Sequence, residues 1–323
     1  MDRKRRMRSL VATLMGRVRP TISLGLASIV IAAAMAVALA AEPERVTVLF
    51  TNDLHVRVGR LAAVGEAIDR VRHEAENVLL VDAGDAWHDF RVPPLACWGG
   101  AEIVRWMNSV GYDAMAIGNH EFAVGARQLT VHTTGCSFPL LSANTLTVGG
   151  MPRPFEDVAR LPVGTHEVLI VGLTTGEFFP AGMIPWMRIE DPVGALDRAV
   201  ASEDREDPNV LIVVVAHFGV AEAIRLSDKV PWVDLIVTGH THQPTETPVV
   251  VGDTLIVQGS PFALGLGRLD LSISEEGQIT DWCFEHIRVD GPALGDLGRE
   301  GRRRLATILL LSVAVVFVWV GGL

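Results

Sequence analysis

The sequence repeats one arrangement five times: a short apolar run that ends directly in aspartate, asparagine or histidine. The five ends are Thr51-Asn52-Asp53-Leu54-His55, Gly84-Asp85, Gly118-Asn119-His120-Glu121, Ala216-His217 and Gly239-His240-Thr241-His242. The runs before them, such as 114–117 and 210–215, are typical of buried strands. Polar residues at the ends of neighbouring strands meet along one edge of a sheet. We therefore expect residues far apart in the sequence to form one polar site.

Helical patterns separate the first of these strands. Apolar residues recur at helical spacing over 61–71 and 103–110, and Gly111 is a typical residue after the end of a helix. The order strand, helix, strand, helix, strand over 46–117 predicts an α/β fold. From Val249 onward the strands become shorter, with turns at Gly252-Asp253 and Glu276-Gly277, so we expect a second sheet with antiparallel character there.

Both ends of the chain carry membrane-type signals. Residues 1–20 form a basic leader, and the uncharged run 21–41 predicts either a signal peptide or a membrane anchor. Residues 291–304 read as a linker, and the uncharged segment 305–323 predicts a C-terminal transmembrane segment. The basic leader outweighs the arginines at 302–304 in setting topology. We therefore expect a membrane-anchored protein with residues 45–290 outside the cytoplasm, in the periplasm or the extracellular space.

The middle of the chain is strongly acidic. The two terminal segments, 1–41 and 301–323, hold ten of the 28 basic residues but only one of the 38 acidic residues. A surface of this charge disfavours a nucleic-acid polymer as partner, because phosphate backbones need basic side chains. It remains compatible with a small anionic substrate held by metal ions. No feature of the sequence indicates a protein partner.

Seven of the polar strand-end residues form a ligand set of nitrogen and oxygen atoms without thiolate. They are Asp53, His55, Asp85, Asn119, His217, His240 and His242. Such a set suits Zn, Mn, Fe or Co. Seven ligands exceed one tetrahedral site and suffice for two metals if a carboxylate bridges them. Two metals about 4 Å apart can activate a water near neutral pH and polarise a phosphoryl oxygen.

These motifs, in this order, resemble the calcineurin-like metallophosphoesterases. The chain is most similar to the N-terminal metallophosphatase domain of bacterial periplasmic 5′-nucleotidases, over roughly residues 45–290. Further stretches that carry the resemblance are 51–53, 118–122, 141–144 and 265–269. The resemblance implies a four-layer α/β/β/α sandwich, here between N- and C-terminal hydrophobic membrane segments.

The resemblance also implies roles for the polar residues around two divalent transition-metal ions, Mn, Zn, Co or Fe. The implied ligands are Asp53, His55 and His242 for the first metal, Asp85 as the bridge, and Asn119, His217 and His240 for the second metal. His120 would be the catalytic residue that stabilises charge on the phosphate or the leaving group. Glu121 is interpreted as a supporting carboxylate rather than a general base.

The chain departs from the family pattern in two places. The family usually has an aspartate that orients the catalytic histidine where this chain has Ala123. A histidine without that carboxylate has a less defined tautomer, and Asp89 or His88 are candidates to replace it. In addition, the nucleotidases carry a further C-terminal domain that contributes the nucleoside pocket, where this chain is expected to have a membrane segment.

The leading hypothesis is therefore hydrolysis of phosphomonoesters, nucleotides included, by a metal-activated water. The first alternative is a phosphodiesterase or pyrophosphohydrolase acting on a nucleotide or a lipid head group. The second alternative belongs to another class: a metal-binding scaffold with weak or no turnover, because Ala123 replaces the usual aspartate. A related group of hydrolases acts on sulfur compounds, but the Asn119-His120 pair favours phosphate.

Overall fold

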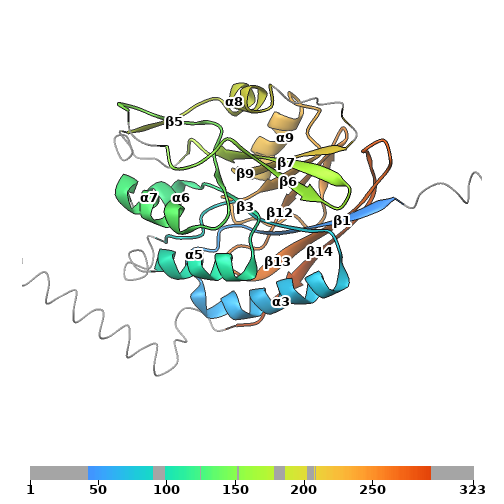
Figure 1. Cartoon of the computed structure of the whole chain (residues 1–323), viewed down its shortest axis with the longest axis horizontal. Helices are drawn as coiled ribbons and strands as arrows, with labels where there is room; N and C mark the ends of the chain where they lie inside the picture. The colour runs from blue at the N-terminus through green and yellow to red at the C-terminus, as the bar shows by residue number, and fades with distance from the viewer. Residues whose placement is uncertain are drawn as a thin grey trace, which may run out of the picture. The chain divides into compact units, whose positions relative to one another are not determined.

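The computed structural model describes residues 43–89, 99–123, 125–150, 153–177, 186–201, 207 and 209–291 (Figure 1). The segments predicted at 1–20, 21–41 and 305–323, and all but the first residue of the predicted linker, lie outside these residues. Within the described ranges, no helix combines the length and the apolar character that a membrane crossing requires. The domain boundaries therefore stay predictions. The described elements belong to the compact unit that begins at Glu44.

Two six-stranded sheets form the centre of this unit. The first has the order β14 (Ile279–Arg288), β13 (Gly265–Ile273), β1 (Glu44–Thr51), β2 (Val78–Asp82), β3 (Ala114–Ala116), β4 (Leu140–Leu141). The second has the order β11 (Val249–Val251), β12 (Thr254–Gln258), β10 (Leu235–Thr238), β9 (Val210–His217), β7 (His166–Thr174), β6 (Val158–Val163). A small separate ribbon pairs β5 (Thr145–Thr147) with β8 (Met187–Ile189).

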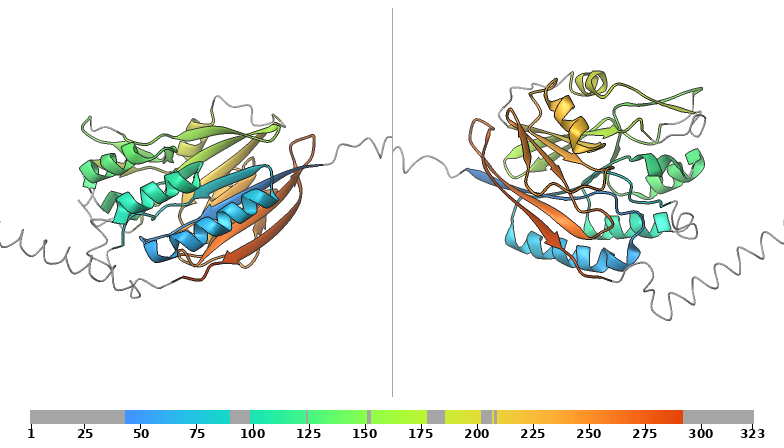
Figure 2. Two further views of the ribbon diagram at one scale, coloured as in Figure 1. Left: turned by 60° about the horizontal axis from the view of Figure 1, so that its bottom comes forward. Right: turned by 180° about the vertical axis from the view of Figure 1, so that it is seen from behind.

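Helices cover the outer faces of both sheets (Figures 1 and 2). The first sheet is covered by α3 (Leu61–Glu74) and α5 (Gly99–Val110), and the second by α8 (Pro192–Ala199) and α9 (Val220–Ser227). The remaining helical elements are η1 (Val58–Arg60), α6 (Asn119–Ala123) and α7 (Gly125–Gly135). The helices predicted over 61–71 and 103–110 are confirmed, and so is the mixed α/β fold. The polar residues after the apolar run 114–117 begin α6.

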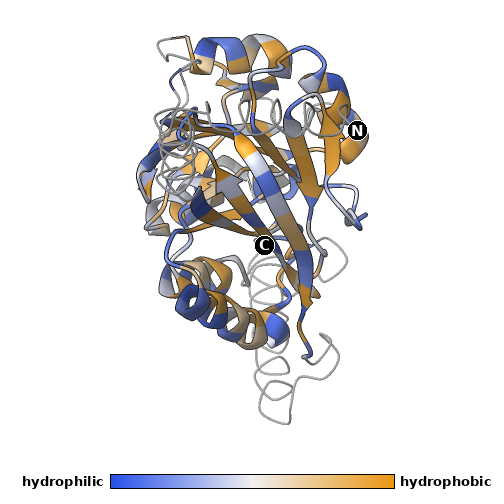
Figure 3. Ribbon diagram, turned by 90° about the vertical axis from the view of Figure 1, so that its right-hand side faces the viewer, coloured by the Kyte–Doolittle hydropathy of each residue, from blue (hydrophilic) through white to orange (hydrophobic). Residues whose placement is uncertain are grey.

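Three hydrophobic cores separate the layers. One lies between α3, α5 and the first sheet, the second lies between the two sheets, and the third lies between the second sheet and α8 and α9. In β9, Val213 contributes to the middle core while its neighbour Ile212 contributes to the helix-covered core. Both faces of β9 are therefore buried, which explains why its sequence is apolar without alternation. Figure 3 shows mostly hydrophobic strands and hydrophilic residues on the helices.

The antiparallel character expected after Val249 is confirmed for the pairs β11–β12 and β13–β14, but these strands do not form a sheet of their own. Strands β11 and β12 extend the second sheet, whereas β13 and β14 extend the first, because β13 pairs antiparallel with β1 from Glu44↔Ile273 to Phe50↔Gly267. A side chain at position 267 would overlap the ring of Phe50, so glycine permits this pairing. The local pattern indicates strands but does not specify the partner strand.

Parallel pairing brings the predicted polar residues together. Strands β1, β2 and β3 run parallel, and so do β7, β9, β10 and β12 in the other sheet. Strand β3 also contacts β7 and β9, so the two sheets lie close at this point. The loops that follow these strands therefore converge from both sheets, as the sequence pattern predicts.

Candidate metal centre

Backbone strain is concentrated in the loops of this site. The described residues other than glycine with positive φ are Asp53, His55, Val56, Asp85, His240, His242, Phe262 and Ala263. The left-handed conformation costs roughly 1–3 kcal/mol for such residues, so it persists only where the surroundings enforce it. Five of the predicted metal ligands adopt it. The chain therefore stores strain in the loops that position them.

Backbone hydrogen bonds continue the pairing of β1 and β2 into their loops. Asp53 N donates to Gly84 O at 2.8 Å, and His55 N donates to Asp85 O at 2.9 Å. Gly84 has φ +92°, and a Cβ there would lie 2.7 Å from Gly118 N. Glycine is thus required where the loops after β2 and β3 approach each other. These contacts place the carboxylates of Asp53 and Asp85 at the same edge.

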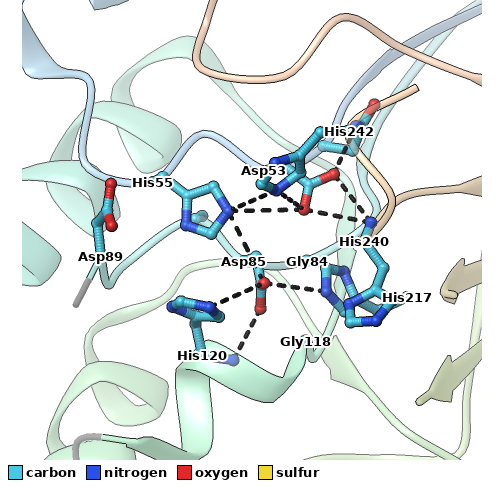
Figure 4. Close-up of polar contacts among 12 residues, drawn as sticks. Asp53, His55, Gly84, Asp85, Asp89, Gly118, His120, His217, His240 and His242 are labelled. Atoms are coloured by element: carbon cyan, nitrogen blue, oxygen red, sulfur yellow. Dashed lines mark hydrogen bonds and ion pairs between the residues drawn. The ribbon is translucent and has the colours of Figure 1, made fainter. Parts of the chain in front are cut away.

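The side chains form three overlapping groups that could hold a metal ion. The groups are Asp53, His55 and His242; His55, Asp85 and His120; and Asp85, His217 and His240. Within each group the ligand atoms lie within 4.8 Å of one another. Figure 4 shows Asp85 among the rings of His55, His120 and His217. Asp85 therefore belongs to two of the groups, and His55 links it to the group of Asp53 and His242.

The distances within the first group are short. His242 Nε2 lies 3.3 Å from Asp53 Oδ1 and 3.0 Å from His55 Nε2. In the last group, His217 Nε2 lies 3.1 Å from Asp85 Oδ2. Two imidazole nitrogens and a carboxylate oxygen pointing at one position match the ligands that zinc and similar metals prefer.

Asn119 supplies independent support for a cation site. Its side-chain oxygen is buried and has no hydrogen-bond partner among the described residues. Leaving a buried polar atom unsatisfied costs about 1–3 kcal/mol, and such atoms require an explanation. An amide oxygen is an acceptor only, so a metal ion would satisfy it. The donor set therefore fits a divalent metal on both sides of Asp85.

Hydrogen bonds from Nδ1 to backbone oxygens orient two of the imidazole rings. His217 Nδ1 donates to Ala83 O at 2.6 Å, and His55 Nδ1 donates to His88 O at 2.9 Å. Each ring therefore directs its other nitrogen, Nε2, toward a carboxylate. Metal-binding histidines in proteins are held by such contacts, which fix the tautomer.

Charges in the site are strongly coupled. Burial alone would raise the pKa of Asp85, but His217, His55 and His120 lower it far below its usual range. Burial favours neutral His217, yet Asp85 overcomes this and raises the pKa of His217 to about 10. Burial lowers the pKa of His55 to about 4, so this ring is neutral and ready to bind a metal.

Glu121 joins two of the converging loops. It is fully buried and accepts hydrogen bonds from the backbone N–H groups of Asp85, Ala86, Trp87 and Gly118, at 2.8–3.1 Å. Burial and the charge of Asp85 raise the pKa of Glu121 to about 7. Its carboxylate is directed at the backbone rather than at solvent, which agrees with the interpretation as a supporting residue.

His120 lies on the solvent side of the cluster. Its side chain is 19% exposed, and Nε2 is 3.8 Å from Asp85 Oδ2. Its backbone N–H donates to Asp85 Oδ1 at 2.8 Å, which fixes where the side chain starts. Of the two candidates to orient it, Asp89 forms an ion pair with Arg57, while the rings of His88 and His120 lie 5.7 Å apart. The orienting role stays a prediction for both.

Three residues at the site were not predicted. Glu177 Oε2 lies 3.5 Å from His240 Nε2, the ring of Phe262 lies 4.7 Å from that of His242, and Arg57 packs over Phe262. Glu177 follows β7 and Phe262 follows β12, but neither fits the pattern of an apolar run that ends directly in aspartate, asparagine or histidine. Their place a few residues after an apolar run was a weak signal for these two residues, whereas nothing local marks Arg57.

Comparisons with known proteins agree with this geometry. A model of the calcineurin-like phosphoesterase family matches residues 46–244. The chain is 30% identical to snake venom 5′-nucleotidase of Gloydius brevicauda, covering 76% of this chain and 48% of that protein. It is also 30% identical to 5′-nucleotidase of Bos taurus, with coverages of 74% and 48%. The chain thus spans about half the length of these relatives.

A solved structure shows the same fold at similar coverage. The 5′-nucleotidase precursor of Thermus thermophilus superposes with a TM-score of 0.69 at 26% identity, covering 85% of this chain and 59% of that chain. The chain belongs to the calcineurin-like phosphoesterase family. The predicted family and the predicted class, a metal-dependent phosphoesterase, are confirmed at this level.

Proposed function

We propose that this protein hydrolyses phosphate monoesters, nucleotides included, with a water activated by two divalent transition-metal ions. The observation that carries the proposal is Asp85, whose carboxylate is shared by two groups of potential metal ligands. The similarity to 5′-nucleotidases supports nucleotides as the substrate class. The terminal segments 1–41 and 305–323 motivate the further proposal that the protein is tethered to a membrane with residues 45–290 outside the cytoplasm.

The proposed ligands divide around Asp85 into two positions. Asp53, His55 and His242 would bind the first ion, and Asn119, His217 and His240 would bind the second. When bound, two such ions lower the pKa of a coordinated water and polarise the phosphoryl oxygen.

The protein's own residues would hold the substrate and the loops. Of the histidines in the three groups of potential ligands, His120 is the most exposed after His242. It would donate a hydrogen bond to the phosphate or to the leaving oxygen. Glu121 would keep the loops after β2 and β3 at a constant separation, since it bonds the backbone of both.

A panel of substrates and metals tests the proposal. The full-length protein would be assayed for phosphate release from a nucleoside monophosphate, a cyclic diester and a pyrophosphate, with Mn, Zn and Co added in turn. We expect the monoester to be cleaved fastest and cleavage to stop with a chelator. Preference for the diester or the pyrophosphate would support the phosphodiesterase or pyrophosphohydrolase alternative. Absence of metal binding would refute the proposal.

A metal-binding scaffold is the second candidate, because Ala123 stands where the family usually has an orienting aspartate. The variant Ala123→Asp restores that carboxylate in α6, three residues after His120. A rise in the hydrolysis rate would identify a weakened enzyme. No turnover in either form, with both metals bound, would favour the scaffold.

A further inference from the structure

A buried ion pair joins two loops of the metal centre. Arg57 Nη2 donates to Asp89 Oδ2 at 2.8 Å, and the side chains are 15% and 1% exposed. Arg57 belongs to the loop after β1, and Asp89 to the loop after β2. A buried pair is weak evidence for stability, because desolvation of both charges offsets much of their attraction. Its position calls for another explanation.

The guanidinium of Arg57 contacts three loops at once. Besides Asp89, it donates to the backbone oxygen of His55, and its Cζ lies 4.9 Å from the ring centroid of Phe262, in the loop after β12. The planar fork of arginine can make these contacts simultaneously, whereas an ammonium cannot. His55, Val56 and Phe262 all have positive φ, so the guanidinium connects strained segments.

Two hydrogen bonds connect His55 to the loop after β2, one directly and one through Arg57. Its Nδ1 donates to the oxygen of His88, the residue before Asp89, and its own oxygen accepts from Arg57. Fixing the ring at Nδ1 and the backbone at oxygen leaves Nε2 directed at Asp53 and His242. The second metal position depends instead on the hydrogen bond from His217 to Ala83, in which Arg57 takes no part.

We propose that Arg57 and Asp89 are positioning residues for the first metal position, holding His55 Nε2 toward Asp53 and His242; the proposal rests on the proposed dinuclear function. The ion pair of Arg57 and Asp89 positions a ligand of the first metal ion only. Its loss should weaken binding of the first ion and leave the second nearly unchanged.

Metal titration of the full-length protein tests this. Binding of Mn²⁺ would be followed by calorimetry and by electron paramagnetic resonance, which reports paired ions. We expect wild type to bind two ions. Arg57→Lys keeps a charge beside Asp89 but loses the fork, so it should weaken one of the two sites by about 10–100-fold, as for other residues that support metal ligands.

A matched control separates this effect from the loss of any ion pair. Arg268 is 17% exposed and pairs with Glu74 at 2.8 Å, so it has nearly the exposure and the distance of Arg57. Arg268→Lys should leave both affinities unchanged. An equal loss in Arg268→Lys and Arg57→Lys would overturn the proposal.

A double variant distinguishes positioning from stability. Replacing both charges, Arg57→Met with Asp89→Leu, leaves no unpaired buried charge, so folding should be retained. We expect this variant to melt near the wild-type temperature and still to lack tight binding of one ion. Two tight ions in this variant would overturn the positioning role while leaving the proposed function intact. Absence of ions in wild type would overturn both.

Discussion

The two ends of strands β9 and β10 place carboxylates in opposite surroundings. At the carboxyl ends, His217 and His240 face Asp85. At the amino ends, Asp234 precedes β10 and accepts a hydrogen bond from Ile212 N at 2.7 Å. Asp234 lines a cavity of about 530 Å³ whose other walls include Asp253 and two tryptophans, Trp232 and Trp282; none of the described residues that line it is a lysine or an arginine.

Burial acts in the same direction at both ends, but the neighbours decide the outcome. Burial and the charge of Asp253 raise the pKa of Asp234 to about 6. Burial would also raise the pKa of Asp85, yet three imidazoles lower it below its usual range. Both carboxylates accept backbone N–H bonds, so backbone hydrogen bonding does not explain the difference. The imidazoles therefore make the carboxyl ends of β9 and β10 a site for a cation, where a metal ion can replace the protons on the ligands.

The largest expected effect is at the carboxyl end. Asp85→Asn removes the charge shared by both groups of ligands, so we expect metal content and hydrolysis rate to fall by more than about 100-fold, beyond the usual loss of a supporting residue. Metal analysis and initial rates measure this. Asp234→Asn, at the other end of the same strands, should leave both unchanged. Equal effects of the two variants would contradict the comparison.

Glu121→Gln should give the next largest effect, on folding. The carboxylate accepts four backbone N–H bonds, and an amide cannot accept all of them because its NH₂ group is a donor. We expect the free energy of unfolding to fall by about 3 kcal/mol, measured by urea unfolding of the metal-free protein. Unchanged stability would show that the loops are held by other contacts.

Asp234→Asn should have a smaller effect of the opposite sign. The folded protein holds the Asp234 proton up to about pH 6, whereas the unfolded chain releases it near its ordinary pKa of about 4. The folded state thus binds more protons in this window, so this residue's contribution to stability decreases as pH rises from about 4 to 6. Asparagine keeps an acceptor for Ile212 N without a charge.

We therefore expect Asp234→Asn to raise the free energy of unfolding by on the order of 2 kcal/mol at pH 7.5, and by almost nothing below about pH 4. Urea unfolding at several pH values measures this. A gain that did not depend on pH would assign the effect to packing rather than to charge.

The smallest expected effect belongs to the exposed partner of a surface pair. Glu74 is 52% exposed and pairs with Arg268. Glu74→Gln should change the free energy of unfolding by less than about 1 kcal/mol, because solvent screens such pairs. Thermal unfolding measures this. A larger loss would show that exposed charged pairs stabilise this protein more than the comparison of Asp85 with Asp234 suggests.

The strand ends and most of the site residues could be predicted from the order of residues along the chain. Parallel strands carry residues after their carboxyl ends to one edge, so Asp53, Asp85, His217 and His240 could be grouped from the order of apolar runs alone. The helices α3 and α5 could be predicted because their apolar spacing is a local property. The role of each ligand at a given ion stays a prediction.

Which segments pair with one another became visible only in the folded chain. The pairing of β13 with β1 joins residues more than 200 positions apart, and no local pattern names the partner strand. Arg57 looks like an ordinary charged loop residue in the sequence, and only the fold brings it within 2.8 Å of Asp89 with both side chains largely shielded from solvent. Likewise, the opposite pKa shifts of Asp85 and Asp234 depend on neighbours supplied by other strands, because electrostatic interactions act through space rather than along the chain.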